Sequence, residues 1–149
     1  MNLYTYPLKN KSRTVKEIKK AVNTYYKDLD EFPQIKKMSI PEFFDYVKKI
    51  PYMRDESSEE VVSRPKYLLT IFPALDCKKK SILFGSFMKY KYGSGSYRFI
   101  LSSNRPDGAI SHIFTQFFDG KNWINADCTY ANNILGNKKR VTNFEIVKG

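Results

Sequence analysis

Three side chains in this sequence have the types that nucleophilic acyl transfer requires: Cys77, the single histidine His112, and Asp127. In such a triad a thiolate attacks a carbonyl carbon, an imidazole accepts the thiol proton, and a carboxylate fixes the tautomer and orientation of the imidazole. Residue types alone are weak support, because a lone cysteine on an apolar helix is usually a small buried hydrophobe. The hypothesis therefore depends on the elements that would bring the three side chains together.

His112 and Asp127 lie in a segment, residues 110–130, whose pattern is typical of a β-hairpin. Asp119-Gly120 separates two runs of apolar, β-branched and aromatic residues, and Asp-Gly favours a two-residue type I′ turn. A two-residue turn fixes the register of the two strands. The facing pairs that it predicts are Phe118 with Lys121, Gln116 with Trp123, Phe114 with Asn125, and His112 with Asp127. Facing side chains have Cβ atoms about 4.5–5.5 Å apart, so the turn predicts an imidazole beside a carboxylate.

Cys77 is expected in the first turn of a core helix that continues over residues 78–91, with Asp76 as the N-cap residue. The apolar residues that recur at helical spacing are Ile82, Leu83, Phe84, Phe87 and Met88. The N–H groups at a helix start would stabilise a thiolate and would hold the oxyanion that forms when a carbonyl is attacked. Cys128 alternates with Asp127 along its strand, so it should point to the opposite face as a packing residue.

The remaining segments predict helices before this central helix and strands after it, which is an α+β arrangement. Residues 1–13 are expected to form a basic arm, and residues 14–29 a helix. Ser39, followed by Pro41 and Glu42, predicts the start of a second helix that runs to Ile50. Residues 65–73 are apolar and bounded by prolines, which fits a helix or a strand. We expect polar loops at 54–64 and 104–108, a turn at 93–96 and a strand at 97–101.

The composition fits one folded domain, because the chain has 149 residues and 42% of them are hydrophobic. The N-terminus lacks the apolar core and cleavage site of a signal peptide, and no apolar run reaches the roughly 20 residues of a membrane span. We therefore expect a cytoplasmic protein whose two cysteines are reduced. One histidine and two cysteines without Cys-x-x-Cys spacing do not supply the four ligands of a structural zinc site, and no cofactor is expected.

Three motifs resemble those of the transglutaminase-like family of cysteine enzymes. That family combines Asp-Cys at a helix start, a His-Val/Ile-aromatic strand and Gly-x-Trp-x-x-x-Asp-x-Thr. The matching segments here are Leu75-Asp76-Cys77, Ser111-His112-Ile113-Phe114, and Gly120 to Thr129. Arg64-Pro65 and Leu68-Leu69 also resemble the run before the cysteine in small phage and bacterial members.

The resemblance extends over residues 64–130 and implies a papain-like core with Cys77, His112 and Asp127 as a catalytic triad. The single domain, residues 1–149, would then contain a helical part at 14–50 and this catalytic-type core at 64–130. Two departures stand out. Leu75 occupies a position where such members usually carry glycine, and Lys78 to Lys80 replace acidic residues. Three lysines beside a thiolate would favour its ionised form and would change which substrates approach.

The first functional hypothesis is a cysteine amidase, peptidase or acyl transferase that acts on peptide or isopeptide amides. Resemblance to phage members suggests peptidoglycan peptides or virion proteins as substrates, and a virion as a second possible location. The alternative is a non-catalytic virion or structural protein that keeps the fold and uses it for interactions. A net charge of +11 favours contact with polyanions, but the lysines are scattered, and no helix-turn-helix, zinc or Gly-rich signature supports a simple nucleic-acid-binding module.

Overall fold

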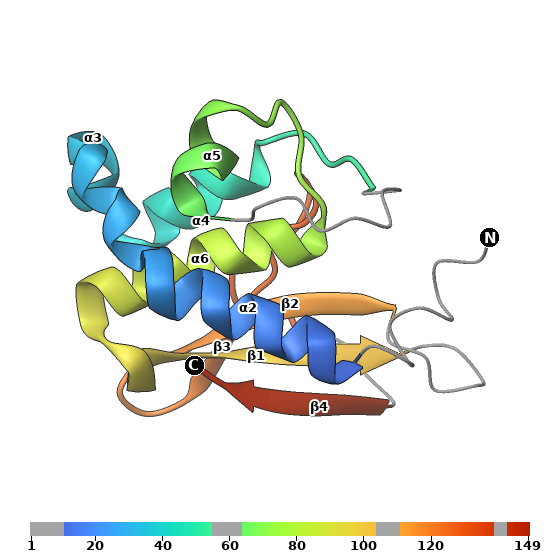
Figure 1. Cartoon of the computed structure of the whole chain (residues 1–149). Coiled ribbons are helices and arrows are strands. Elements are labelled where there is room, and N and C mark those ends of the chain that lie inside the picture. The colour runs from blue at the N-terminus through green and yellow to red at the C-terminus, as the bar shows by residue number, and fades with distance from the viewer. Residues whose placement is uncertain (1–10, 55–63, 104–110, 139–142) are drawn as a thin grey trace.

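The computed structural model describes residues 11–54, 64–103, 111–138 and 143–149, and its helices lie on one side of an antiparallel sheet (Figure 1). The described helices are α2 (Lys11–Tyr25), α3 (Pro33–Lys36), α4 (Ile40–Lys48), α5 (Pro65–Thr70) and α6 (Cys77–Tyr92), with 3-10 turns η1 (Tyr26–Glu31) and η2 (Ser94–Ser96). The described strands are β1 (Tyr97–Ser103), β2 (His112–Phe118), β3 (Trp123–Ala126) and β4 (Asn143–Lys148), in the order β3-β2-β1-β4. The predicted α+β class is confirmed.

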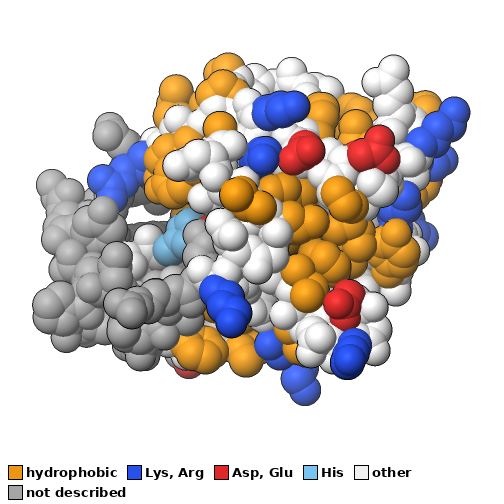
Figure 2. All heavy atoms as spheres, turned by 180° about the vertical axis from the view of Figure 1, so that it is seen from behind, with side chains coloured by type: hydrophobic (Ala, Val, Ile, Leu, Met, Phe, Trp, Pro, Cys, Tyr) orange, Lys and Arg blue, Asp and Glu red, His pale blue; other side chains and the backbone are white. Residues whose placement is uncertain are grey.

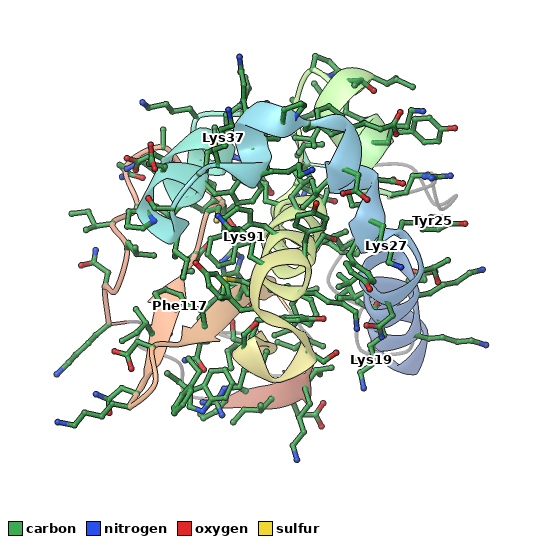
Figure 3. The ribbon with its side chains drawn as sticks, turned by 90° about the vertical axis from the view of Figure 1, so that its left-hand side faces the viewer. Lys19, Tyr25, Lys27, Lys37, Lys91 and Phe117 are labelled. Carbon is green, nitrogen blue, oxygen red and sulfur yellow. The ribbon has the colours of Figure 1, made fainter. Side chains whose placement is uncertain are left out.

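Helix α6 forms the centre of the core, and both of its long sides are covered. The sheet lies against it through Phe117 of β2, whose ring centroid is 6.4 Å from that of Phe84 (Figure 3). Gly85 allows the close approach of β1, because a Cβ atom there would lie 2.8 Å from the ring of Phe99. On the other side Phe43 of α4 stacks on Phe87 with ring centroids 4.2 Å apart. In the middle of β1 and β2, odd-numbered residues such as Phe99 and Phe117 therefore face α6, and even-numbered residues face away.

The first helix begins earlier and ends earlier than predicted. Helix α2 starts at Lys11, so the last residues of the expected arm are helical, whereas residues 1–10 lie outside the described part. After Tyr25 the chain tightens into η1, which buries both Asp28 and Leu29. The buried Asp28 carboxylate accepts from Arg64, at 2.9 Å from Nε and 2.7 Å from Nη2. This inward ion pair explains why the regular helix does not continue to Leu29.

Residues that favour the start of a helix lie at the start of α4 and α5. Ser39 and Glu42 form a capping box, in which the Glu42 N–H donates to Ser39 Oγ and the Ser39 N–H donates to Glu42 Oε1. Pro65 lies in the first turn of α5, so the apolar stretch that fitted either helix or strand is a short helix. The predicted turn at 93–96 is Gly93, with φ of +91°, followed by η2.

The connection between β2 and β3 is not the predicted two-residue turn. The observed facing pairs are Phe118 with Trp123, Phe117 with Ile124, Gln116 with Asn125, and Thr115 with Ala126, which is two residues from the predicted register. The Asp119 carboxylate accepts from the N–H groups of Lys121 at 2.8 Å and Asn122 at 2.6 Å. A type I′ turn needs positive φ at two residues, but within this described loop only Gly120 has one, at +99°. The side chain of Asp119 thus stabilises a four-residue loop instead.

Strand β4 was not predicted, although residues 143–148 carry the alternation of a strand. It pairs with β1 and forms one edge of the sheet, with Ile146 opposite Ile100. The expected loops at 54–64 and 104–108 fall almost wholly outside the described residues. Across the described part of the chain, no helix combines the length and the apolarity that crossing a membrane would require.

Candidate active site

Cys77 is the first residue of α6, and the N-cap residue before it is Asp76, as predicted. Asp76 Oδ1 accepts from the Lys79 N–H at 2.8 Å, and the Lys80 N–H donates to the Asp76 carbonyl at 3.0 Å. The N–H of Cys77 itself has no carbonyl acceptor within the helix, because it precedes the first helical hydrogen bond. The positive end of the α6 dipole and this N–H group therefore both lie at the sulfur-bearing residue.

His112 and Asp127 contact each other directly. His112 Nε2 lies 2.7 Å from Asp127 Oδ2, and the side chains are 22% and 3% exposed, respectively. Cys77 lies close enough to raise the pKa of His112. Because Nε2 is engaged by Asp127, Nδ1 is the ring nitrogen left for the thiol. The histidine reaches the surface beside hydrophobic side chains (Figure 2). The structure thus brings Cys77, His112 and Asp127 into one cluster.

His112 and Asp127 are in contact although the observed register differs from the predicted one, and the reason is geometric. A shift of two residues changes the facing partner but leaves each side chain on the same face of the sheet. Strand β3 ends at Ala126, opposite Thr115, so Asp127 follows on the face that Phe114 and His112 share. The two residues are therefore diagonal neighbours, and a carboxylate and an imidazole can span that separation.

Helix α6 and strand β2 run side by side with their first residues at the same end. Ser81 Oγ donates to the Ile113 carbonyl at 3.3 Å, and one turn further along the helix Phe84 packs against Phe117. The start of the helix, with Cys77, therefore lies at the start of the strand, with His112. This parallel packing explains how residues 35 positions apart in sequence meet.

The pKa of His112 results from opposing influences. Burial favours the neutral ring and lowers the pKa, but hydrogen bonds to Asp127 and Cys77, together with the negative charges of both partners, raise it to about 9. The imidazole is therefore protonated at neutral pH when its partners are ionised. A protonated imidazole beside a cysteine is what a thiolate–imidazolium pair in a cysteine nucleophile requires.

The Asp127 carboxylate is held by its own backbone surroundings. Its Oδ1 accepts from the Thr129 N–H at 3.1 Å, and its main-chain carbonyl accepts from Asn133 Nδ2 at 3.1 Å. Thr129 is itself buried, with 1% exposure. The Asp-x-Thr spacing thus has a physical role, because the second residue after the aspartate fixes the carboxylate that contacts His112.

The three lysines after Cys77 each have an acceptor other than the thiol. Lys78 Nζ lies 3.6 Å from Glu17, and Lys79 Nζ lies 3.9 Å from Asp76. Lys80 is 1% exposed and donates to two main-chain carbonyls, Ile50 at 2.5 Å and Thr129 at 2.8 Å. Burial lowers the pKa of Lys80, although the charges of Cys128 and Asp127 oppose that effect. The three lysines thus make separate structural contacts.

Two tyrosines that sequence reasoning missed lie beside the cluster. Tyr52 pairs with Leu75 in an isolated parallel bridge, and its ring centroid is 5.1 Å from that of Tyr130. Burial raises the pKa of Tyr52 to about 12, and the nearby Cys77 charge adds to the rise. No local pattern around Tyr52 indicated this position, because it depends on a contact between segments that are more than 20 residues apart.

Cys128 is separate from the cluster, as predicted. It is 4% exposed, belongs to the hydrophobic core, and its thiol contacts the Ala126 carbonyl at 3.8 Å. Burial raises the pKa of the Cys128 thiol well above its usual value. Both cysteines are free.

A small polar hollow of about 140 Å³ lies beside Asp127. The residues that line it are Asn125, Asp127, Asn133, Ile134, Asn137 and Lys138. Two of the side-chain amides that line it are already paired: Asn125 Nδ2 donates to the Asn137 carbonyl at 2.9 Å, and Asn133 Nδ2 donates to the Asp127 carbonyl at 3.1 Å. These hydrogen bonds hold the chain on both sides of Asp127 in place.

Comparison with family models, curated proteins and solved structures gave no significant match.

Proposed function

We propose that the protein is a cysteine-dependent amidase or peptidase in which Cys77 is the nucleophile, His112 the acid–base group and Asp127 the orienting carboxylate. The observation that carries the proposal is the chain of contacts from Asp127 through His112 to Cys77, at the start of α6. The resemblance of residues 64–130 to the transglutaminase-like family supports the same assignment.

The reaction follows from these positions. The Cys77 thiolate attacks the carbonyl carbon of an amide, a C–S bond forms, and the carbonyl electron pair moves to oxygen. The helix start and the Cys77 N–H stabilise that oxyanion. When the intermediate collapses, the C–N bond breaks and the leaving nitrogen takes the proton from His112. An acyl-thioenzyme remains on Cys77.

The second half of the reaction regenerates the free Cys77 thiolate from the acyl-thioenzyme. Water loses a proton to His112 and attacks the thioester carbonyl, which releases a carboxylic acid and the thiolate. An amine that reaches the thioester before water would give a new amide, so the same residues also support acyl transfer. Small phage and bacterial members of the family that this chain resembles suggest peptide, isopeptide or peptidoglycan cross-link amides, or virion proteins, as substrates.

Thiol reactivity tests the proposal without knowledge of the substrate. At pH 7 we expect iodoacetamide to alkylate Cys77 at least about tenfold faster than it alkylates glutathione, because only the thiolate reacts. Asp127→Asn should lower that rate, because an amide can donate to Nε2 and hold the ring in the wrong tautomer. Peptide mapping by mass spectrometry locates the modified cysteine.

Two variants control this measurement. Cys128→Ala removes the buried thiol and should leave the fast phase unchanged, whereas Cys77→Ala should abolish it while circular dichroism shows an intact fold. A Cys77 that reacts no faster than glutathione would exclude an activated nucleophile. Release of amine from peptide amides by the wild type, lost in Cys77→Ala, would be the corresponding positive result.

The sheet surface favours a second candidate, an interaction protein that does not depend on Cys77. Phe118, Phe144 and Ile146 lie on the face away from α6 and are 41%, 51% and 46% exposed. Exposed apolar side chains gathered on one face are typical of protein contacts. In that case binding of a virion or structural partner would persist in Cys77→Ala and would fall in Phe144→Ser.

A further inference from the structure

The surface beside Cys77 carries two exposed aromatic rings on segments far apart in sequence. Tyr52 follows α4 and is 40% exposed, and Tyr130 follows β3 and is 45% exposed. Their rings are tilted by 54° with centroids 5.1 Å apart, a spacing typical of a favourable aromatic pair. The pair leaves part of each ring open to solvent.

Main-chain hydrogen bonds place this pair next to the nucleophile. The Leu75 N–H donates to the Pro51 carbonyl at 2.9 Å, and the Met53 N–H donates to the Leu75 carbonyl at 3.2 Å. The segment that carries Tyr52 is thus bonded to the residue two positions before Cys77. Tyr130, on the other side of the pair, is three residues after Asp127.

A buried ammonium group holds the two segments together. Lys80 lies one helical turn after Cys77 and donates to the carbonyl of Ile50, two residues before Tyr52, and to that of Thr129, one residue before Tyr130. A lysine with 1% exposure is costly to bury, so its contacts must be made within the protein. The same helix therefore supplies the nucleophile and fixes the rings beside it.

We propose that Tyr52 and Tyr130 form an aromatic wall of the Cys77 site, which selects acyl donors that carry an apolar or planar group next to the attacked carbonyl. The inference rests on the proposed function, because it assigns a specificity element to the same nucleophile. Lys80 is a positioning residue for this wall. Aromatic and aliphatic groups pack against ring faces in many orientations. The chemical type of the substrate group therefore matters more than its exact shape.

Two chloroacetamides that differ in one substituent test this selection. N-benzylchloroacetamide carries a ring next to the reacting group, and chloroacetamide itself carries none. For each protein the ratio of the two alkylation rates at Cys77 is divided by the same ratio for glutathione, which removes intrinsic reactivity. We expect a corrected ratio of about threefold to tenfold in the wild type.

Variants distinguish the effect of the aromatic rings from the effect of their hydroxyl groups and from a general change in the fold. Tyr52→Ala and Tyr130→Ala should each bring the corrected ratio close to one. Tyr52→Phe and Tyr130→Phe should retain the ratio, because they keep the rings. Tyr92, exposed at the far end of α6, supplies the matched control, since Tyr92→Ala should change neither rate.

The two proposals fail in different ways. A corrected ratio of one in the wild type, or an unchanged ratio in both alanine variants, would overturn the aromatic wall, whatever the absolute rate. A slow absolute rate with both reagents would overturn the activated nucleophile, and the ratio would still report on the wall. A high ratio that both alanine variants lose supports the wall.

Discussion

His112 is shared by two acidic partners, and this sharing determines how the site responds to pH. Its ring contacts the Asp127 carboxylate through Nε2, and Cys77 also raises its pKa, so a protonated ring can pair with both groups. The apparent titration belongs to the coupled group and not to one residue. Reactivity that depends on the imidazolium should therefore persist through neutral pH and change only in alkaline solution.

We predict that His112 stabilises the folded protein at neutral pH and ceases to do so above about pH 9. The folded-state pKa of His112, about 9, lies above its ordinary value of 6.5, so folding favours the protonated ring. The stabilisation is complete below pH 6.5 and is lost as pH rises to about 9. Its size, about 3 kcal/mol, should appear as a difference in unfolding free energy between the wild type and His112→Gln that shrinks over this interval. A difference that stayed constant from pH 6 to 9.5 would contradict the assigned contacts.

At the scale of elements, helix α6 supports the site from its first turn. The N-cap contact from Asp76 to the Lys79 N–H holds the turn in which Cys77 lies. Removal of an N-cap acceptor destabilises a helix because an N–H group at its start loses its partner.

Asp76→Ala should lower the free energy of unfolding by about 1 kcal/mol, measured by urea denaturation. Asp76→Asn keeps an oxygen acceptor and should cost only a small fraction of that. Ser39→Ala at the start of α4 is a comparison of the same kind in a helix that does not contribute to the site. If Asp76→Asn were as destabilising as Asp76→Ala, charge and not the cap would be responsible.

Local sequence patterns predicted the helices and strands better than they predicted the turn and the register between strands. The capping box at Ser39, the cap at Asp76 and the strand at Tyr97 are encoded within a few residues, so they could be read from the sequence. The turn at Asp119 could not, because its carboxylate competes with the backbone and changes the loop length. The pairing of His112 with Asp127 was nevertheless anticipated, since an even shift in register preserves the face of each strand.

Long-range contacts set the parts of the site that sequence reasoning missed. From the sequence, Lys80 was one of three lysines expected beside the Cys77 thiolate. The folded chain shows that its ammonium group donates to the carbonyls of Ile50 and Thr129. Tyr52 and Tyr130 have no shared motif. Such positions depend on which loops approach the start of α6, and this is a property of the assembled core.

At the scale of the whole molecule, one ion pair joins the helical part to the segment that leads into the site. Arg64, at the start of α5, binds Asp28 of η1 through two nitrogens and stacks over the ring of Tyr25 at 4.2 Å. Burial would raise the pKa of Asp28, but the hydrogen bonds and charge of Arg64 outweigh it and lower the pKa. Positive charges elsewhere are dispersed: Lys19 of α2, Lys27 of η1 and Lys37, which follows α3, are all exposed (Figure 3).

We predict that Arg64→Met destabilises the protein by about 2–4 kcal/mol at pH 7, because it leaves a buried carboxylate without its partner. The stabilisation by Asp28 is present above its ordinary pKa of 3.8 and is lost as pH falls through the lowered value. The variant should therefore approach the wild type in stability as the solution becomes acidic. Lys66→Met, which breaks the exposed pair with Glu31, is the control and should cost about 0–1 kcal/mol. Equal losses in the two variants would show that burial of Asp28 is unimportant.

The two cysteines differ in exposure, so alkylation can be used to measure the fraction of folded molecules. Cys77 opens a helix at the surface, whereas Cys128 is enclosed in the core. A pulse of alkylating reagent therefore adds one mass increment to a folded chain and two to a chain that has opened. The fraction of doubly labelled molecules in a mass spectrum measures unfolding in a mixture, such as a cell extract, where no optical signal could be assigned to this protein.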